Sequence, residues 1–116
     1  MNTRLMGAMG EQAAARYLRS EGYKILSANY RTYCGEIDII AQKGGFICFV
    51  EVKTRTAGGM YSPADAVGAS KQKNITDSAL IYMGVKKNGL TPRFDIIEVT
   101  VENEAVSGIR HIEGAF

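Results

Sequence analysis

The feature that most constrains this chain is a pair of strand-like segments joined by Gly44 and Gly45. Residues 36–42 and 46–53 are rich in Ile, Val and Phe, which favour β-strands. Two adjacent glycines between such segments are typical of a two-residue hairpin turn. The sequence therefore predicts an antiparallel hairpin over these two segments.

The turn fixes which side chains of the hairpin face each other. If the two glycines are the loop residues, Lys43 faces Phe46, and the same register places Asp38 opposite Glu51. Directly opposed residues share a face, with Cβ atoms about 4.5–5.5 Å apart. Lys53 lies two residues beyond Glu51 and shares that face. A slip of one residue would move every side chain to the other face, so the prediction depends on the turn.

Two opposed carboxylates repel each other, and burial raises the pKa of at least one of them. The other face of the hairpin is predicted to be apolar, formed by Ile37, Ile39, Val50 and Val52. The hairpin is therefore expected to be central in a sheet, with its acids partly enclosed. A cation such as Mg²⁺ removes the conflict, because one or two carboxylates commonly hold it together with water and substrate phosphate. Such an ion lowers the pKa of bound water, and Lys53 would offset charge on the phosphate.

The alternative is a surface strand pair whose charges neutralise one another, with Glu36 and Lys53 as a cross-strand ion pair. Short motifs of acids and a lysine often occur without a function. The register and the apolar opposite face weigh against this alternative without excluding it.

Glu11 is a further candidate for the same site. It lies in a predicted helix over residues 3–20, flanked at helical spacing by Gly7, Gly10 and Ala14. These small residues would let the helix approach the sheet closely, so that the glutamate points toward it. The alternative is a solvent-facing residue, since glutamate is a good helix former.

Three basic side chains are candidates for contacts with phosphate. Lys71 falls within the apolar stripe of a second predicted helix, so it either reaches the site or extends its ammonium to solvent. Arg55 continues the Glu51 and Lys53 face of its strand and can donate two hydrogen bonds to a phosphate. Arg31 lies near the mouth of the strand region, where a solvated arginine is the alternative.

The remaining elements complete a mixed α/β domain. Predicted elements are a helix over residues 3–20 that ends at Glu21-Gly22, a strand over 23–31, the hairpin, a helix from Ser62 to about Met83, and strands over 93–101 and 107–112 around an Asn103-Glu104 turn. Ser62 suits the N-cap, Pro63 the first helical position and Asp65 the third, with Gly84 as the stop. The order α-β-β-β-α-β-β indicates a mixed sheet of about five strands flanked by helices, in a single domain over residues 1–116.

Composition narrows the class of protein. No segment is apolar and long enough to span a membrane, and the N-terminus has no run of signal-peptide type. Cys34 and Cys48 lack metal-ligand spacing and fit a reduced, cytoplasmic protein. The single histidine, His111, is interpreted as structural, which weighs against Ser-His or Cys-His catalysis. Between Val52 and Phe94 seven basic residues stand against two acids, which is compatible with a phosphate-rich ligand.

Together these residues resemble the PD-(D/E)xK nuclease superfamily. The chain is more closely similar to the YraN-like family of uncharacterised bacterial proteins, which resembles archaeal Holliday-junction resolvases. The similar segments are Gly10-Glu11-Gln12-Ala13-Ala14, Asn29-Tyr30-Arg31, Gly35-Glu36-Ile37-Asp38-Ile39-Ile40-Ala41, Phe49-Val50-Glu51-Val52-Lys53-Thr54-Arg55, Lys71-Gln72-Lys73 and Arg93-Phe94-Asp95. They span nearly the whole chain in order. Ile37 stands where the proline of the superfamily's name precedes the aspartate, a replacement that removes no ligand.

The resemblance implies a restriction-endonuclease-like fold and a metal-dependent endonuclease that acts on DNA, including branched recombination or repair intermediates. The catalytic residues implied by position are Glu11, Asp38, Glu51 and Lys53. The implied ligands of Mg²⁺ or Mn²⁺ are Asp38, Glu51 and Glu11. Nucleic-acid contacts are expected from Arg31, Arg55, Lys71 and Lys73. A homodimer is compatible with the resemblance, because many nucleases of this fold pair to cut two strands.

Two other functions fit the same residues. A non-catalytic nucleic-acid-binding module with this fold would bind DNA without metal, with an affinity that falls as salt rises. A protein-interaction domain with structural acids would have no affinity for nucleic acid. It would lose stability when Lys53 is removed, because an uncompensated acid pair would remain.

Overall fold

The computed structural model describes residues 2–58, 67–85 and 89–116. The elements in chain order are α1 (Thr3–Ser20), β1 (Lys24–Thr32), β2 (Gly35–Lys43), β3 (Phe46–Thr56), α2 (Ala69–Val85), β4 (Thr91–Glu102) and β5 (Ala105–Ile112). The strands form one five-stranded sheet in the order β1-β2-β3-β4-β5. The predicted mixed sheet, flanking helices and element order are confirmed.

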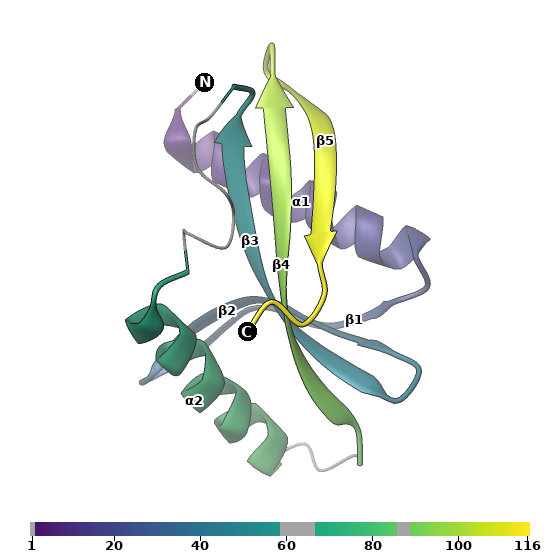
Figure 1. The fold of residues 1–116 in the computed structure, drawn as a ribbon, viewed down its shortest axis with the longest axis vertical. Coiled ribbons are helices and arrows are strands. Elements are labelled where there is room, and N and C mark those ends of the chain that lie inside the picture. Colours follow the sequence, from purple (N-terminus) through teal and green to yellow (C-terminus); the bar gives the residue numbers. More distant parts are fainter. Residues whose placement is uncertain (1, 59–66, 86–88) are drawn as a thin grey trace.

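The sheet is mixed because one connection crosses over. β3 pairs parallel with β4, and the other neighbouring strands pair antiparallel. A parallel pair requires a crossover, and α2 lies in the segment that joins β3 to β4. In Figure 1, β1 and β2 run across the lower part of the molecule, whereas β3, β4 and β5 stand nearly upright. The sheet is therefore strongly twisted between β2 and β3.

Each face of the sheet has its own core, and each core is covered by one helix. Under α1 the buried residues are Ala13, Ala14, Leu18, Tyr23, Ile39, Ala41, Cys48, Val50, Ile97 and Val99. Under α2 they are Ile37, Ile40, Ile47, Phe49, Val67, Ile75, Ala79, Tyr82 and Ile96. Because both faces of β2 and β3 are covered, the predicted central position of the hairpin is confirmed.

The first helix begins and ends where the sequence predicts. The side chain of Asn2 accepts a hydrogen bond from the Leu5 N–H at 2.9 Å, which caps the N-terminus. At the other end Gly22 has a φ of 89°, and the Tyr23 N–H donates to the Leu18 carbonyl at 2.9 Å. This is the glycine-terminated arrangement expected at a helix C-terminus.

The second helix differs from its prediction at both ends. The predicted N-cap and first turn, Ser62 to Asp65, lie outside the described residues. Among the described residues the helix begins at Ala69, because the Gly68 carbonyl accepts the first helical hydrogen bond from the Gln72 N–H at 2.9 Å. Gly84 does not stop the helix, which continues to Val85. A glycine inside a helix costs about 1 kcal/mol, and this helix tolerates it near its end.

No helix among residues 2–58, 67–85 and 89–116 is both long and apolar enough to cross a membrane.

Candidate functional site

The predicted register of the hairpin is confirmed, but its last predicted pair is not formed. Among the described residues, pairing of β2 with β3 runs from Lys43–Phe46 to Ile39–Val50 and ends there. Asp38 and Glu51 are therefore not a ladder pair, because β2 turns away from β3 at this point. The Asp38 carboxylate enters the fork between the two strands, where its Oδ2 accepts a hydrogen bond from the Val52 N–H at 2.8 Å. A side chain thus replaces the lost backbone partner.

The strand on the other side of Asp38 is also irregular. β1 pairs Ala28 with Ile39 and Tyr30 with Ile37, and Asn29 between them has a φ of 52°. Only a few per cent of non-glycine residues adopt a positive φ, and asparagine is among the more frequent. The irregularity changes the faces of β2: Ile39 packs under α1, whereas Ile37 packs under α2. The prediction that both isoleucines share one face was wrong.

On the α2 side, Glu51 is the centre of a compact charge cluster. Its carboxylate is nearly buried, and its Oε1 lies 2.6 Å from the Lys71 Nζ and 3.5 Å from the Lys53 Nζ. Of the two alternatives for Lys71, the structure shows the one in which its ammonium group reaches the site. The alternative cross-strand pair of Glu36 with Lys53 is not formed, because Glu36 binds Arg31 at 3.1 Å.

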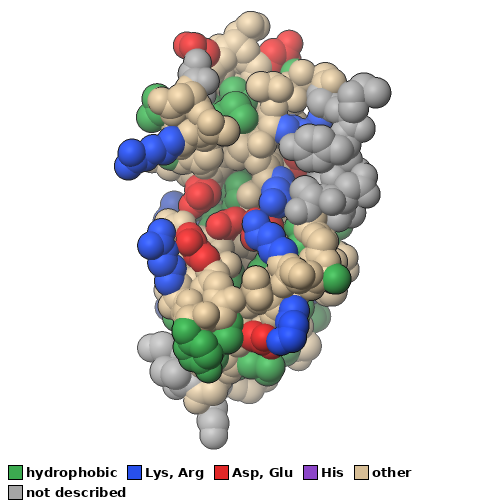
Figure 2. Space-filling model, turned by 90° about the vertical axis from the view of Figure 1, so that its left-hand side faces the viewer, with side chains coloured by type: hydrophobic (Ala, Val, Ile, Leu, Met, Phe, Trp, Pro, Cys, Tyr) green, Lys and Arg blue, Asp and Glu red, His purple; other side chains and the backbone are tan. Residues whose placement is uncertain are grey.

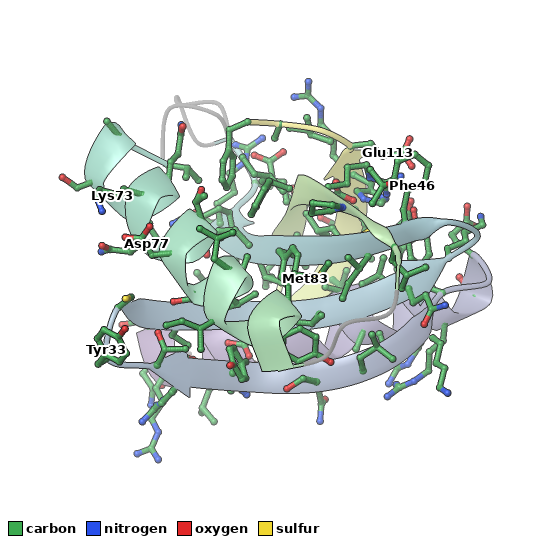
Figure 3. The ribbon with its side chains drawn as sticks, turned by 90° about the horizontal axis from the view of Figure 1, so that it is seen from below. Tyr33, Phe46, Lys73, Asp77, Met83 and Glu113 are labelled. Carbon is green, nitrogen blue, oxygen red and sulfur yellow. The ribbon has the colours of Figure 1, made fainter. Side chains whose placement is uncertain are left out.

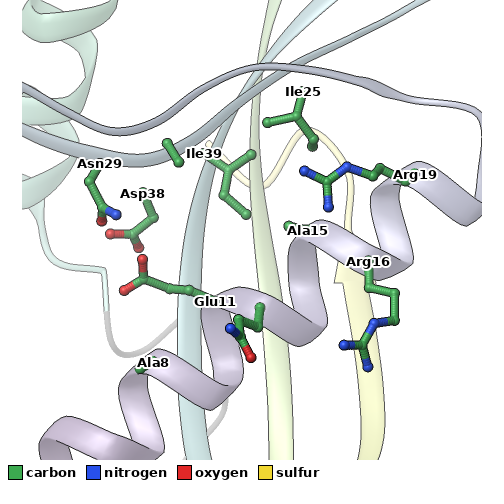
Figure 4. A pocket seen from close by; sticks show the side chains of 11 residues that line it. Ala8, Glu11, Ala15, Arg16, Arg19, Ile25, Asn29, Asp38 and Ile39 are labelled. Carbon is green, nitrogen blue, oxygen red and sulfur yellow. The ribbon is translucent and has the colours of Figure 1, made fainter.

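On the α1 side, Glu11 points toward the sheet, as predicted, and meets Asn29 (Figure 4). With the Asn29 amide oriented to satisfy its neighbours, its nitrogen donates to Glu11 Oε1 at 2.9 Å and to Glu36 Oε1 at 3.1 Å. Burial and the neighbouring Glu36 raise the pKa of Glu11. The sequence predictions gave Asn29 no role; its only signal was its place in a segment shared with the YraN-like family.

Gly10 brings Glu11 to the sheet. A Cβ added at Gly10 would lie 1.8 Å from Thr54 Oγ1, on strand β3. No heavy atom lies within 4 Å of the corresponding Cβ position at Gly7. Of the two glycines that sequence analysis singled out, only Gly10 is required for the close approach of α1.

We expect Gly10→Ala to lower the free energy of unfolding by about 1–3 kcal/mol, because the new methyl group overpacks the contact with Thr54. Gly7→Ala is the matched control and is expected to be neutral or stabilising, since alanine is the better helix former. The double variant Gly10→Ala/Thr54→Ala removes the clashing atom and is expected to recover much of the loss. Urea denaturation of the variants measures these values. An equal loss in Gly7→Ala, or no recovery in the double variant, contradicts the close packing.

Asp38 is the most perturbed carboxyl group of the site. Burial, followed by the charge of Glu51, raises its pKa to about 7, although the hydrogen bond from the Val52 N–H acts in the opposite direction. Near neutral pH this carboxyl therefore exchanges readily between a protonated and a charged form. A cation next to both acids would favour their charged forms, and would so offset the effects of burial and of repulsion between them.

The raised pKa of Asp38 predicts how the Asp38→Asn variant responds to pH in the absence of divalent ions. The carboxyl pKa is 3.8 in the unfolded chain and about 7 in the folded one, so wild-type stability falls as pH rises between these values. Asparagine has no charge to bury and can still accept from the Val52 N–H. We expect the stability of Asp38→Asn relative to wild type to be greater by about 2 kcal/mol at pH 7 than at pH 5. Thermal unfolding at both pH values measures this, and an equal difference at the two would contradict the raised pKa.

The residues at Asp38 fit a partly hydrated divalent ion. The described residues contain no group of three or more His, Cys, Asp or Glu side chains that could hold a metal ion. Asp38 and Glu51 nevertheless could supply the one or two carboxylates that Mg²⁺ commonly takes from protein, with water and substrate phosphate as its other ligands. Glu11 lies in the α1-side cavity with Asp38, and its role as a ligand stays a prediction.

The other predicted phosphate contacts are each paired with an acid. Arg55 binds Glu98 at 2.7 Å, and Lys73 binds Asp77 at 2.6 Å on α2. Figure 3 shows Lys73 and Asp77 together on the outer side of this helix. Arg31, which binds Glu36, is highly exposed. Their contacts with nucleic acid remain predictions.

Two cavities meet at Asp38. The cavity on the α2 side has a volume of about 440 Å³ and is lined by Glu51 and Lys71, among others. The cavity on the α1 side has a volume of about 460 Å³ and contains Glu11. Figure 2 shows acidic side chains gathered in the middle of one face of the molecule, with basic ones on both sides. Asp38 therefore stands between two openings that a ligand can occupy.

A second buried polar cluster ties the C-terminal segment to the sheet. Asp95 is fully buried and accepts hydrogen bonds from Arg93 at 2.7 and 2.9 Å and from the Gly114 N–H at 3.1 Å. His111 Nε2 lies 2.7 Å from the same carboxylate, and its Nδ1 lies 3.1 Å from the Tyr17 hydroxyl. Burial alone would raise the pKa of Asp95, but the hydrogen bonds from His111 and Arg93 outweigh it and lower the pKa. These contacts agree with a structural role for His111.

Comparison with known proteins identifies close relatives. The model of the "Uncharacterised protein family UPF0102" matches residues 10–99. A UPF0102 protein of Chlorobaculum parvum is 45% identical over 96% of this chain and 91% of its own. One from Alkaliphilus oremlandii is 43% identical over the full length of both. Among solved structures, Pyrococcus furiosus SfsA in complex with Ca²⁺ has a TM-score of 0.40 and 16% identity, covering 97% of this chain and 64% of that one. This last similarity is too low to support an assignment.

Proposed function

The chain belongs to the uncharacterised protein family UPF0102, and from the chemistry of its site we propose that it is a metal-dependent endonuclease that hydrolyses phosphodiester bonds in DNA. The observation that carries the proposal is the fork between β2 and β3. It holds Asp38, with a pKa raised to about 7, beside a nearly buried Glu51 that contacts two lysines. Perturbed carboxyl groups next to charge partners in a cavity are typical of functional sites.

Asp38 and Glu51 would hold the ion. When bound, Mg²⁺ or Mn²⁺ would polarise a phosphoryl oxygen and lower the pKa of bound water. Asp38 must lose its proton to act as a ligand, so its pKa of about 7 couples binding of the ion to pH. Glu51 already has its charge balanced by two ammonium groups, which an arriving cation would displace from the carboxylate.

Lys53 and Lys71 would then face the substrate phosphate. Both lie on the α2 side of the fork, within 3.5 Å of the Glu51 carboxylate. Burial, partly offset by Glu51, lowers the pKa of Lys53. Ammonium groups fixed in a partly enclosed site stabilise charge that develops on a phosphate more strongly than they would in water.

The alternative function is a nucleic-acid-binding module that needs no metal. Its supporting observation is that Glu51 is already neutralised by Lys53 and Lys71, so that this carboxylate needs no ion to balance its charge. This function predicts binding of DNA that survives Glu51→Gln and is unaffected by removal of divalent ions.

The proposal is tested by incubating the wild-type protein with Mg²⁺ or Mn²⁺ and a set of DNA substrates: linear duplex, single strand, flap and four-way junction. Cleavage of at least one substrate by wild type, lost in Asp38→Asn, is expected. Asp77→Asn changes the same side-chain type on the outer side of α2 and should cut like wild type. Cleavage of no substrate, or equal cleavage by Asp38→Asn, would reject the nuclease function.

A further inference from the structure

The α1-side cavity at Asp38 is lined by two arginines that have no acidic partner among the described residues. Arg16 and Arg19 are exposed on α1 and both line the cavity. Within the part of the chain that the structure describes, neither side chain forms a hydrogen bond or an ion pair. In contrast, all four cations that the sequence predicted as phosphate contacts have an acidic partner. Arg16 and Arg19 therefore bring positive charge into this cavity, where a ligand can reach it.

The cavity has opposite charges at its two ends. Asp38 and Glu11 lie at one end, and Figure 4 shows Arg16 and Arg19 farther along the helix. The arginines follow Glu11 by five and eight residues, which corresponds to about 7.5 and 12 Å along the helix axis. Their guanidinium groups would therefore meet groups beyond the one held at Asp38.

The lining between the two ends is mostly apolar. Its apolar members are Ala15, Ala28, Ile25 and Ile39, and Gln12 adds one polar side chain. A ligand that suits this surface carries anionic groups at intervals and apolar faces between them. The sugar-phosphate backbone of a nucleic acid, with its bases, has this pattern.

We propose that this cavity is the path of one strand of the DNA substrate, and that Arg16 and Arg19 bind backbone phosphates next to the phosphate at Asp38. The inference rests on the proposed function for the identity of the phosphate at Asp38. The cavity volume of about 460 Å³ is in the range of small-ligand sites. A DNA duplex is wider than its own major groove, which is about 12 Å across. The cavity therefore suits a single strand rather than a duplex. The substrate class is thus DNA with a single-stranded segment at the cut, as in flaps and overhanging ends.

The inference is tested by measuring DNA binding under conditions that prevent cleavage. Fluorescence anisotropy in EDTA, with a labelled single-stranded oligothymidylate of about 12 nucleotides, gives the affinity over a series of salt concentrations. Each phosphate contact with a single strand contributes about 0.7 to the slope of log affinity against log salt, so loss of two contacts lowers that slope by about 1.4. We expect this loss, with weaker binding, in Arg16→Gln/Arg19→Gln. Because both side chains are exposed, the thermal stability of the variant should stay unchanged.

Two control variants separate a phosphate site from general attraction. Arg16→Lys/Arg19→Lys retains both charges and should keep the wild-type slope. Lys24→Gln/Lys43→Gln removes the same amount of charge from exposed residues that do not line the cavity. This variant should also keep the wild-type salt slope. An unchanged slope in Arg16→Gln/Arg19→Gln, or an equal loss in the Lys24 and Lys43 variant, would overturn the inference.

Competition experiments identify the occupant. Unlabelled single strand should displace the probe better than duplex of the same length, and better than polyglutamate. Equal or better displacement by either competitor, or no binding of the probe by wild type, would contradict a single-strand path. The binding assay needs no cleavage, so the two proposals can fail separately. If the wild-type protein cuts no DNA but Arg16→Gln/Arg19→Gln has a smaller salt slope, the strand path is supported and only the nuclease function is rejected. If the wild-type protein cuts DNA but Arg16→Gln/Arg19→Gln keeps the wild-type slope, only the strand path is rejected.

Discussion

Replacing Asp95 by alanine is expected to lower the free energy of unfolding by about 3–5 kcal/mol, because it leaves the Arg93 guanidinium and His111 without the anion that both contact. Asp95 is fully buried and accepts hydrogen bonds from both residues and from the backbone of Gly114. The same change also removes one of the contacts that hold the C-terminal segment against β4, where the Ala115 N–H still donates to the Phe94 carbonyl at 2.7 Å. Denaturant unfolding, followed by far-UV circular dichroism, measures the loss.

Two other variants bracket the effect of Asp95→Ala. Asp95→Asn keeps an acceptor for one donor and removes only the charge, so its loss should be smaller. Asp77→Ala breaks an exposed ion pair on α2 and should cost less than about 1 kcal/mol. A loss of that small size in Asp95→Ala would show that the buried cluster does not stabilise the fold.

Lys53→Ala is expected to reduce the rate of DNA cleavage by about 10²–10³-fold while binding of the metal ion is retained. The reason is that Lys53 contributes charge toward the phosphate but is not a ligand, and it competes with a cation for Glu51. Asp38→Asn should abolish both cleavage and metal binding, because it removes a ligand. Rates from single-turnover cleavage and metal affinities from calorimetry separate the two behaviours.

The alternatives give different patterns in the Lys53→Ala and Asp38→Asn variants. If the acids are structural, Lys53→Ala loses stability instead of rate, because Glu51 keeps only Lys71 as its partner. If Lys53 binds the metal ion or holds the other site residues in place, Lys53→Ala lowers the metal affinity together with the cleavage rate. Either pattern would contradict the role proposed for this lysine.

The parts of the site that sequence could predict are those set by local rules. The Gly44–Gly45 turn fixed the register of the hairpin, and that register is observed. The small residue at Gly10 predicted the approach of α1 and the direction of Glu11. The apolar stripe predicted that Lys71 faces the sheet. In each case one short segment carried enough information.

The fork at Asp38 could not be predicted from the hairpin alone. It depends on where β2 leaves β3, and on Asn29 of a third strand, whose positive φ interrupts the opposite ladder. Twist accumulates over the whole sheet and is not set by one turn. For this reason the expected pair of opposed carboxylates became a single inserted carboxylate with cavities on both sides.

Which acid pairs with each basic side chain also could not be predicted from the sequence. Arg55 and Lys73 were expected to face phosphate, but each has an acid within 2.7 Å. No sequence pattern marks Arg16 and Arg19 as phosphate contacts, but they line a cavity with Asp38. Which basic side chains stay available depends on acids brought close by the fold, and no local pattern encodes that.

Calorimetric titration with Mn²⁺ tests the central claim, that Asp38 and Glu51 hold a divalent ion. The titration compares wild type, Asp38→Asn and Asp77→Asn at about pH 8 and about pH 6, above and below the Asp38 pKa of about 7. The account predicts one site in wild type and Asp77→Asn, weaker at the lower pH because protons compete with the ion, and no site in Asp38→Asn. Equal binding by wild type and Asp38→Asn would contradict it.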